Sequence, residues 1–396
     1  MIVGLDPMLI DVDPAVVGIV ILKTVVVFGG LLTATAMMIW FERKIVSDLQ
    51  NRIGPNRAGP FGLLQTVADG VKVMFKEDLL PDRADRKVFT YAPLLSVIPA
   101  FLTFAIVPIA GDFSGDKRGL VEMFGHTTRL QLADPPIGIL LMLAMSSIAV
   151  YGVMLAGWSS GSKYPLIGSV RASAQMVSYE AALGLSVVAV VLVAGTLTTS
   201  GIVNGQATWS WNLWVTGVVP FVIFLIAGTA ELNRPPFDLV EAEQELVGGY
   251  HTEYSGVKFA AYYLAEFMNT ITMSAIIVTL FLGGPNGPML IGPGWLWGLI
   301  WFLLKLVAFL YVFVWFRATL PRFRYDQLMD LGWKALIPLS LGWLLLLIAL
   351  RVGDNEGWNL VLVGAGGIAV LLVGYLLLSL AFRAARRNAD LAEVLD

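Results

Sequence analysis

Long apolar stretches constrain this chain more than any other feature of its sequence. A helix that crosses a bilayer needs about 20 mostly apolar residues. The chain has nine such stretches, at 17–41, 89–110, 137–158, 174–198, 213–231, 259–283, 295–316, 334–350 and 358–381. Only 14% of the 396 residues are charged, against about 25% in soluble domains. The sequence therefore predicts an all-α membrane protein: a single domain, 1–396, with about nine transmembrane helices.

The basic residues are unevenly distributed between the connecting segments. If the N-terminus faces outward, 20 of the 26 lysines and arginines fall on inward segments and four on outward segments. Lys23 and Lys305 lie within spans. Because positively charged loops stay in the cytoplasm, we expect an outward N-terminus and a cytoplasmic tail, 382–396, in a bacterial plasma (inner) membrane. We expect Lys23 to snorkel, and Lys305 to snorkel, to pair with a carboxylate or to line a wet cavity.

Several classes of site are excluded or disfavoured by composition. The chain has no cysteine, which excludes disulfides, thiolate zinc sites and iron–sulfur clusters held by this chain alone. It has two histidines, His126 and His251, which we interpret as surface or loop residues, so no metal site is expected. No glycine-rich nucleotide motif is present. Any electron-transfer cofactors must therefore be carried by partners.

The first inward loop, 42–88, contains a pattern typical of an amphipathic helix. After two Gly-Pro turns, Leu64, Val67, Val71 and Phe75 fall on one helical face. This pattern predicts a helix in the plane of the membrane surface. It is either a simple connection or one wall of an access path for an amphiphilic substrate. Glu42 and Arg43 end the first span and are expected to pair with each other or with a neighbouring loop.

Acidic residues gather around the inward loop at 232–258. Residues 230–269 contain seven carboxylates against Arg234 and Lys258, namely Glu231, Asp238, Glu241, Glu243, Glu245, Glu253 and Glu266. One interpretation is a solvated face favoured by a helix dipole. The other is a chain of coupled carboxylates that holds and passes protons near neutral pH. The membrane depth of Glu231 and Glu266 favours the second interpretation, because ionisable groups are rare there.

Two further inward segments carry charge at the membrane. On 162–180, Arg171 shares a helical stripe with Gln175 and Ser178, and Glu180 lies about 9 Å below the helix start. A carboxylate at that depth is expected to face protein or water. On 317–334, three arginines form a basic cluster, Arg317, Arg322 and Arg324. The cluster is either a positive-inside anchor or a docking point for an acidic peripheral subunit.

Four motifs carry a resemblance to a known family. They are ERK followed by NRIGPNRAGPFGLLQTVADGVK; AGWSSGSKYPLIGSVRASAQMVSYE; AELNRPPFDLVEAEQELV with EYS; and PRFRYDQLMDLGWK. Together they resemble the H subunit of proton-translocating NADH–quinone oxidoreductase (respiratory complex I), the counterpart of mitochondrial chain 1. The resemblance covers about residues 20 to 340. The last span and the outward insertion at 112–129 are less typical of the family.

The resemblance implies a function and a set of partners. It implies a membrane subunit that forms much of the chamber for the substrate quinone, ubiquinone or menaquinone, and couples quinone reduction to proton translocation. It implies flavin and iron–sulfur clusters on partner subunits only. The partners would be peripheral-arm subunits at the quinone site, small membrane subunits and lipid, with no nucleic acid.

The resemblance also assigns residues to sites. It implies a quinone chamber that includes Glu42, Arg43, Arg52, Arg171 and Arg234. It implies an acidic proton path through Glu180, Glu231, Asp238, Glu241, Glu243, Glu245, Glu253 and Glu266. Lys305 falls at a family lysine and would be a buried charge.

Three other functions compete with this interpretation. The membrane subunit of an energy-converting hydrogenase would share the fold and acidic path without a quinone role. A stand-alone secondary transporter usually shows internal repeats, and we find none in the sequence. A passive structural anchor is disfavoured by membrane-depth charges at Glu180, Glu231, Glu266 and Lys305.

Overall fold

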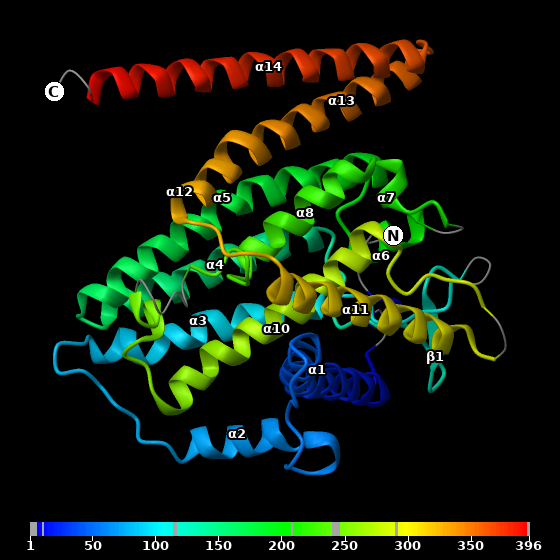
Figure 1. The fold of residues 1–396 in the computed structure, drawn as a ribbon. Helices are drawn as coiled ribbons and strands as arrows, with labels where there is room; N and C mark the ends of the chain where they lie inside the picture. The colour runs from blue at the N-terminus through cyan, green and yellow to red at the C-terminus, as the bar shows by residue number, and fades with distance from the viewer. Residues whose placement is uncertain are drawn as a thin grey trace.

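The chain folds mainly into helices (Figure 1). The computed structural model describes residues 6–9, 12–113, 117–206, 209–239, 246–289 and 292–393, with the backbone alone at 383 and 385–393. The α-helices are α1 (Pro14–Leu49), α2 (Gln65–Met74), α3 (Arg86–Ala105), α4 (Gly138–Ser159), α5 (Lys163–Ala194), α6 (Thr199–Gly205), α7 (Asn212–Val215), α8 (Val218–Glu231), α10 (Gly256–Phe281), α11 (Gly294–Thr319), α12 (Tyr325–Asp330), α13 (Ile337–Asn355) and α14 (Leu360–Glu393). Short 3₁₀ turns are η1 (Pro7–Leu9), η2 (Pro60–Gly62) and η4 (Gly249–His251), and η5 (Leu331–Leu336) is a π-helical segment between α12 and α13.

Within the described residues, eight helices are long and apolar enough to cross a membrane. They are α1, α3, α4, α5, α10, α11, the continuous helix Tyr325–Asn355 and α14. The predicted all-α polytopic fold is confirmed. The predicted span 213–231 differs, because α8 has 14 residues and is about 21 Å long, shorter than the roughly 30 Å hydrocarbon core.

Helix α8 runs from one end of the bundle to its interior. Just before it, the Asn212 side chain donates a hydrogen bond of 2.8 Å to the carbonyl of Leu280 at the end of α10. At the other end of α8, Glu231 is hydrogen-bonded to Ser146 on α4. The segment formed by α7 and α8 therefore begins beside the end of α10 and ends beside Ser146 in α4.

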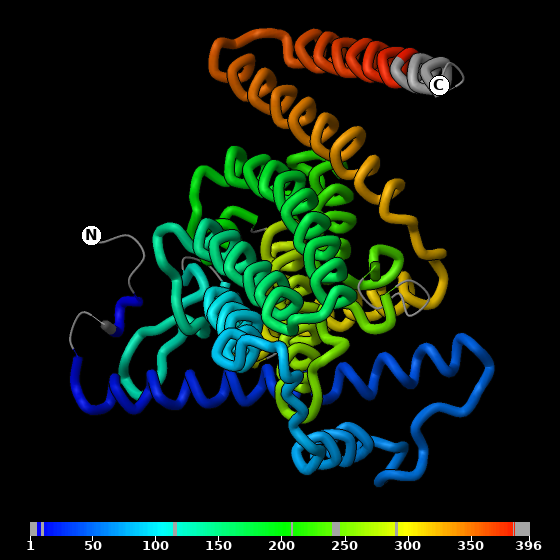
Figure 2. The backbone as a smooth tube through the Cα atoms, turned by 90° about the vertical axis from the view of Figure 1, so that its left-hand side faces the viewer, coloured from blue at the N-terminus to red at the C-terminus, as the bar shows by residue number. Residues whose placement is uncertain are grey.

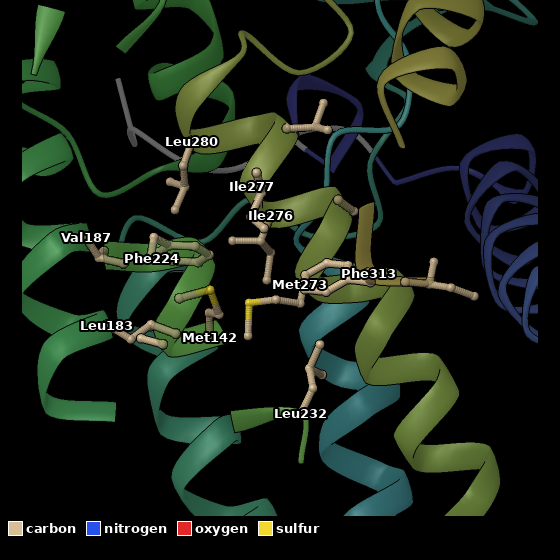
Figure 3. Packing of buried hydrophobic residues seen from close by; sticks show 14 of the residues in the cluster. Met142, Leu183, Val187, Phe224, Leu232, Met273, Ile276, Ile277, Leu280 and Phe313 are labelled. Carbon is tan, nitrogen blue, oxygen red and sulfur yellow. The ribbon is translucent and has the colours of Figure 1, made fainter. Parts of the chain in front are cut away.

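The core is centred on α10, whose second half is buried on all sides (Figure 3). Ile276 and Ile277 lie among side chains from the neighbouring helices α4, α5, α8 and α11, including Met142, Leu183, Phe224 and Phe313. Since lipid tails are as apolar as these side chains, van der Waals packing rather than water exclusion holds such helices together. The buried α10 gives the structure a fixed element on which charged groups are positioned.

The predicted amphipathic helix is present as α2, beneath α1 in Figure 1. None of its residues is buried, and Leu64, Val67, Val71 and Phe75 at and beside it are exposed. Arg43 of α1 pairs with Asp69 of α2 at 2.6 Å. An exposed apolar face tethered to the end of a span is the arrangement expected of a helix lying on a bilayer surface.

The segment 112–129, which was predicted to face outward, contains a β-hairpin that the sequence did not predict. Strands β1 (Leu120–Met123) and β2 (His126–Arg129) pair antiparallel. The prediction that Lys23 snorkels was wrong. Its ammonium group is buried, 3.2 Å from Asp6 and 2.9 Å from Thr128 of β2. Partners from the hairpin and from the chain before α1 satisfy the charge where it lies, so it has no need to reach the interface.

Helix α14 lies outside the bundle and packs along α13 (Figures 1 and 2). The two helices approach closely at glycines. A Cβ at Gly342 would lie 2.4 Å from Leu371, and one at Gly367 would lie 2.3 Å from Leu346. The apolar face of α14 is exposed along the whole membrane-length segment, as expected of a helix surrounded by lipid or by other membrane subunits.

Candidate functional site

A cavity of about 460 Å³ opens where α1 ends. We call it the α1 cavity. Its charged lining residues are Glu42, Arg43, Arg52 and Arg317. Its apolar and aromatic lining comes from α1, the following loop and α10, with Ile39, Val46, Ile53, Tyr263 and Phe267. It therefore offers charged groups and an apolar wall to the same occupant, which suits an amphiphilic molecule.

Arg234 is buried directly behind the α1 cavity and contacts two carboxylates. Its Nη1 lies 2.6 Å from Oε2 of Glu42, and its Nε lies 2.9 Å from Oε1 of Glu266. Its guanidinium also lies over the Phe267 ring, 4.3 Å from the centroid. Arg234 is 5% exposed and Glu42 is 4% exposed. Charges this deeply buried are tolerated only when they are paired.

Glu42 has a second cationic partner, Arg317 at the end of α11. Two arginines and two carboxylates thus form one contiguous group, Arg317–Glu42–Arg234–Glu266. The group carries no net charge when all four side chains are ionised. A change of charge on any one member therefore leaves a buried imbalance for the others to compensate.

Glu266 also lines a second, smaller cavity, which we call the acidic cavity. It has a volume of about 50 Å³, enough for a few water molecules. Its titratable lining residues are Glu231, Asp238, Tyr250, His251, Tyr262 and Glu266. Glu266 and Phe267 are consecutive on α10 and line different cavities. Arg234, which contacts both, therefore lies between the two.

A third cavity, the inner cavity, continues toward the centre of the bundle. It also measures about 50 Å³ and shares Glu231, Leu232 and Asn269 with the acidic cavity. Glu231 is hydrogen-bonded to Ser146, and Glu180 to the next residue, Ser147. Two carboxylates from α8 and α5 thus meet consecutive serines of α4. The path of polar groups extends from the loop after α8 to the interior of the membrane bundle.

The turn after α8 is shaped by Gln175 of α5. Its buried amide donates to the carbonyls of Ala230 and Phe237, at 2.7 and 2.9 Å. The turn thereby places Asp238 in the lining of the acidic cavity and Arg234 against Glu266. Asp238 pairs in turn with Arg322, 3.2 Å away.

The structure brings some predicted site residues together and not others. Glu42, Arg43 and Arg52 line the α1 cavity. Arg171 lies elsewhere, with its guanidinium 5.2 Å from the centroid of the Tyr325 ring. Glu253 is half-buried in the turn before α10 and is not among the described residues that line the three cavities. Glu241, Glu243 and Glu245 lie outside the described residues.

Three contacts of the candidate site were not predicted from the sequence. Arg317 and Arg322 contact Glu42 and Asp238 within this chain, whereas the basic cluster was interpreted as an anchor or a docking point. His251 lies in a loop, as predicted, but it also lines the acidic cavity, which was not predicted. Burial lowers the pKa of His251 to about 4. The position of His251 between the acidic segment and the EYS motif was the one feature of the sequence that could have indicated this contact.

Lys305 lies far from this site, in a different cavity of about 500 Å³. Its ammonium group donates to three backbone carbonyls, those of Leu282, Gly284 and Asn286, at 2.7, 2.9 and 2.8 Å. It neither snorkels nor needs a carboxylate, because the chain beyond α10 supplies one acceptor for each of its three donors. Lys305 thus fixes α11 to the end of α10.

The chain is similar to known proteins over most of its length. The profile of a family described as NADH dehydrogenase matches residues 22–348. The H subunit of the NADH-quinone oxidoreductase of Frankia alni is 52% identical over 371 residues, covering 91% of this chain and 79% of the relative. The corresponding protein of Frankia casuarinae is 51% identical, covering 90% and 78%. That of Cutibacterium acnes is 46% identical, covering 95% and 86%. This polytopic, helical chain therefore belongs to the family of NADH-quinone oxidoreductase H subunits.

Proposed function

We propose that this chain is the membrane subunit of a proton-translocating NADH:quinone oxidoreductase that forms much of the quinone chamber and couples quinone reduction to proton transfer. The observation that supports this most strongly is the contact of one buried arginine, Arg234, with two carboxylates that line different cavities. One of these cavities suits an amphiphile and the other is rich in acidic groups.

The α1 cavity has the properties that a quinone requires. A quinone has a polar head that takes up two electrons and two protons, and an apolar tail. The charged groups of Glu42, Arg52 and Arg317 face the head, and the apolar wall suits the tail. The exposed apolar face of α2 beside it would lie in the bilayer surface from which the quinone enters.

Coupling follows from the charge balance at Arg234. Reduction of a quinone produces anionic oxygens that withdraw protons from nearby donors. A charge change beside Glu42 alters the attraction of Glu42 for Arg234, and the guanidinium moves toward the carboxylate that keeps its negative charge. Glu266 then gains or loses its counter-charge. Inside a protein such an imbalance changes the proton affinity of the carboxylate.

Protons would then pass along the acidic residues. Glu266, Asp238 and Glu231 line the acidic cavity, and Glu231 also lines the inner cavity near Glu180. Water in these two cavities would connect carboxylates that do not touch. The remaining acidic residues of the loop stay candidates for the outer part of this path, namely Glu241, Glu243, Glu245 and Glu253.

The orientation in the membrane follows from the distribution of charged residues, and the partner subunits follow from the family. We infer that the acidic loop and tail are cytoplasmic and the N-terminus is outside the bacterial plasma membrane, with α7 and α8 as a short additional crossing. The partners would be peripheral-arm subunits that carry flavin and iron–sulfur clusters, and small neighbouring membrane subunits. The α1 cavity, at the end of α1 that would face the cytoplasm, lies where electrons from such partners would arrive.

The test is Glu266→Gln in the intact assembly, measured in membrane vesicles. We expect NADH-driven proton translocation to fall, because glutamine cannot take up a proton and removes one partner of Arg234. NADH oxidation with a hydrophilic artificial acceptor, which does not use the quinone chamber, should stay unchanged. The matched control is Asp326→Asn, a carboxylate that is 71% exposed. Proton translocation equal to that of the parent in Glu266→Gln would contradict the proposal.

A further inference from the structure

His251 is the one basic titratable side chain among the described residues that line the acidic cavity. The carboxylates that face the same cavity are Glu231 from α8, Asp238 from the turn after α8, and Glu266 from α10. Tyr250 and Tyr262 add two hydroxyls. From α3, α4 and α5 the lining residues are Ser96, Ala149, Val153 and Met176, which are not titratable.

The segment that carries His251 is held rigidly in place. A Cβ at Gly168 of α5 would lie 2.8 Å from the Cα of Gly249, so η4 packs directly on the α5 backbone. Tyr254 stacks on Phe89 with centroids 4.0 Å apart and donates to the Phe89 carbonyl at 3.1 Å. The His251 ring contacts Tyr250 and Phe259 edge-on, at 5.1 and 5.5 Å. A fixed imidazole is suited to proton transfer, because transfer requires a defined donor–acceptor geometry.

Two of the three carboxylates are already bound to arginines, and the third to a serine. Asp238 pairs with Arg322, Glu266 with Arg234, and Glu231 with Ser146. In these pairs a carboxylate accepts hydrogen bonds or an ion pair but has few ways to hand a proton to another carboxylate. A neutral imidazole has one nitrogen that accepts a proton and one that donates. It therefore supplies the complementary group that a row of paired carboxylates lacks.

We propose that His251 carries protons across the acidic cavity, accepting a proton at one ring nitrogen and releasing another from the opposite nitrogen, between the Asp238 turn and the membrane carboxylates Glu231 and Glu266. The two transfers leave the imidazole neutral, so no net charge stays on it. This inference rests on the proposed function and adds a residue to its proton path.

Burial keeps the imidazole of His251 neutral at rest. The pKa of His251 is lowered to about 4, so the ring is neutral at rest and keeps its acceptor nitrogen free of a bound proton at physiological pH. A permanently protonated ring in this cavity would instead act as a fixed counter-charge, like Arg234 and Arg322.

The test compares the only two histidines of the chain in the intact assembly. His251→Gln keeps a polar side chain but cannot exchange protons in this way, and His251→Ala leaves room for added imidazole. His126→Gln is the matched control, since His126 lies on the outward hairpin 3.5 Å from Asp13. We expect both His251 variants to lower the rate of NADH-driven proton translocation by about tenfold or more. Added imidazole should restore His251→Ala and not His251→Gln, while His126→Gln stays at the parental rate.

Two results would overturn the proposal. One is a parental translocation rate in His251→Ala. The other is a loss in His251→Ala that imidazole does not reverse, since a merely structural histidine would behave in this way. Glu266→Gln separates this failure from failure of the proposed function. If Glu266→Gln lowers translocation and the His251 variants do not, only His251 is removed from the path. If Glu266→Gln is also without effect, the proposed function itself fails.

Discussion

Replacing Arg234 by glutamine tests the charge group that links the cavities. Arg234→Gln removes the cation shared by Glu42 and Glu266. Removing one partner of a buried ion pair costs about 3–5 kcal/mol. The low end, about 3 kcal/mol, applies here because Glu42 keeps Arg317 and the Glu266 side chain is 26% exposed. Since about 1.4 kcal/mol corresponds to a factor of ten, the arrangement in which Glu42 and Glu266 are both ionised at these positions loses about 100-fold in population.

Quinone-dependent turnover is the appropriate assay. If turnover requires both carboxylates to be ionised in place, NADH:quinone reductase activity of membranes carrying Arg234→Gln falls by about 100-fold. NADH oxidation with a hydrophilic artificial acceptor reports how much of the assembly is present, and the quinone activity is normalised to it. Arg324→Gln, in which a 79% exposed arginine is replaced, is the matched control and should keep parental activity.

A double-mutant cycle with Glu42→Gln provides the sharper refutation. Because Glu42 and Arg234 touch, their effects should not add. We expect the double variant to be no less active than Arg234→Gln alone. A double variant whose loss equals the product of the two single losses would show that the residues act independently. That result, or an Arg234→Gln variant with more than about half of parental activity, would refute the reasoning.

Three more substitutions separate buried from exposed interactions, with thermal melting of the purified assembly as the measurement. Lys305→Met removes three charge-assisted hydrogen bonds but also the cost of burying an ammonium group. We expect the free energy of unfolding to fall by about 2–4 kcal/mol. An unchanged melting temperature would contradict this. Because the folded pKa of His251, about 4, lies below the ordinary value of about 6.5, its neutral form stabilises the protein fully above about pH 6.5. That stabilisation, up to about 3 kcal/mol, is lost as the pH falls toward 4, and His251→Gln should remove this part of the acid sensitivity. Arg43→Gln breaks the ion pair with Asp69, whose side chains are 48% and 35% exposed. We therefore expect the free energy of unfolding to fall by less than about 1 kcal/mol, with no measurable shift of the melting temperature.

The fold was largely predictable because bilayer crossing leaves a strong local signal. Apolar length identified eight long helices, and periodicity identified α2. The span at 213–231 was predicted too long, since the break before Val218 divides it into α7 and α8. The β-hairpin was missed because its strands have four residues each and no strong alternation.

The charged residues of the candidate site could be named from the sequence, but the contacts between them could not. Glu42, Arg234 and Glu266 were predicted as candidate site residues, yet Glu42 and Arg234 are 192 positions apart and meet only through helix packing. Lys23 shows the same limit, since its partner Thr128 lies 105 positions away on an unpredicted hairpin. The Glu42–Arg234 pairing depends on the turn that Gln175 holds, and the Lys23 pairing on the hairpin, neither of which a local pattern encodes.

The central claim is that Arg234 couples events at the α1 cavity to the acidic cavity by contacting both carboxylates. The most direct measurement is the number of protons translocated per NADH oxidised in Arg234→Lys, compared with Arg324→Lys. Lysine keeps the charge, but its single ammonium group lacks the fork that reaches two carboxylates. We predict continued quinone reduction with a lower proton-to-NADH ratio in Arg234→Lys and a parental ratio in Arg324→Lys. Equal, parental ratios in both variants would contradict the account.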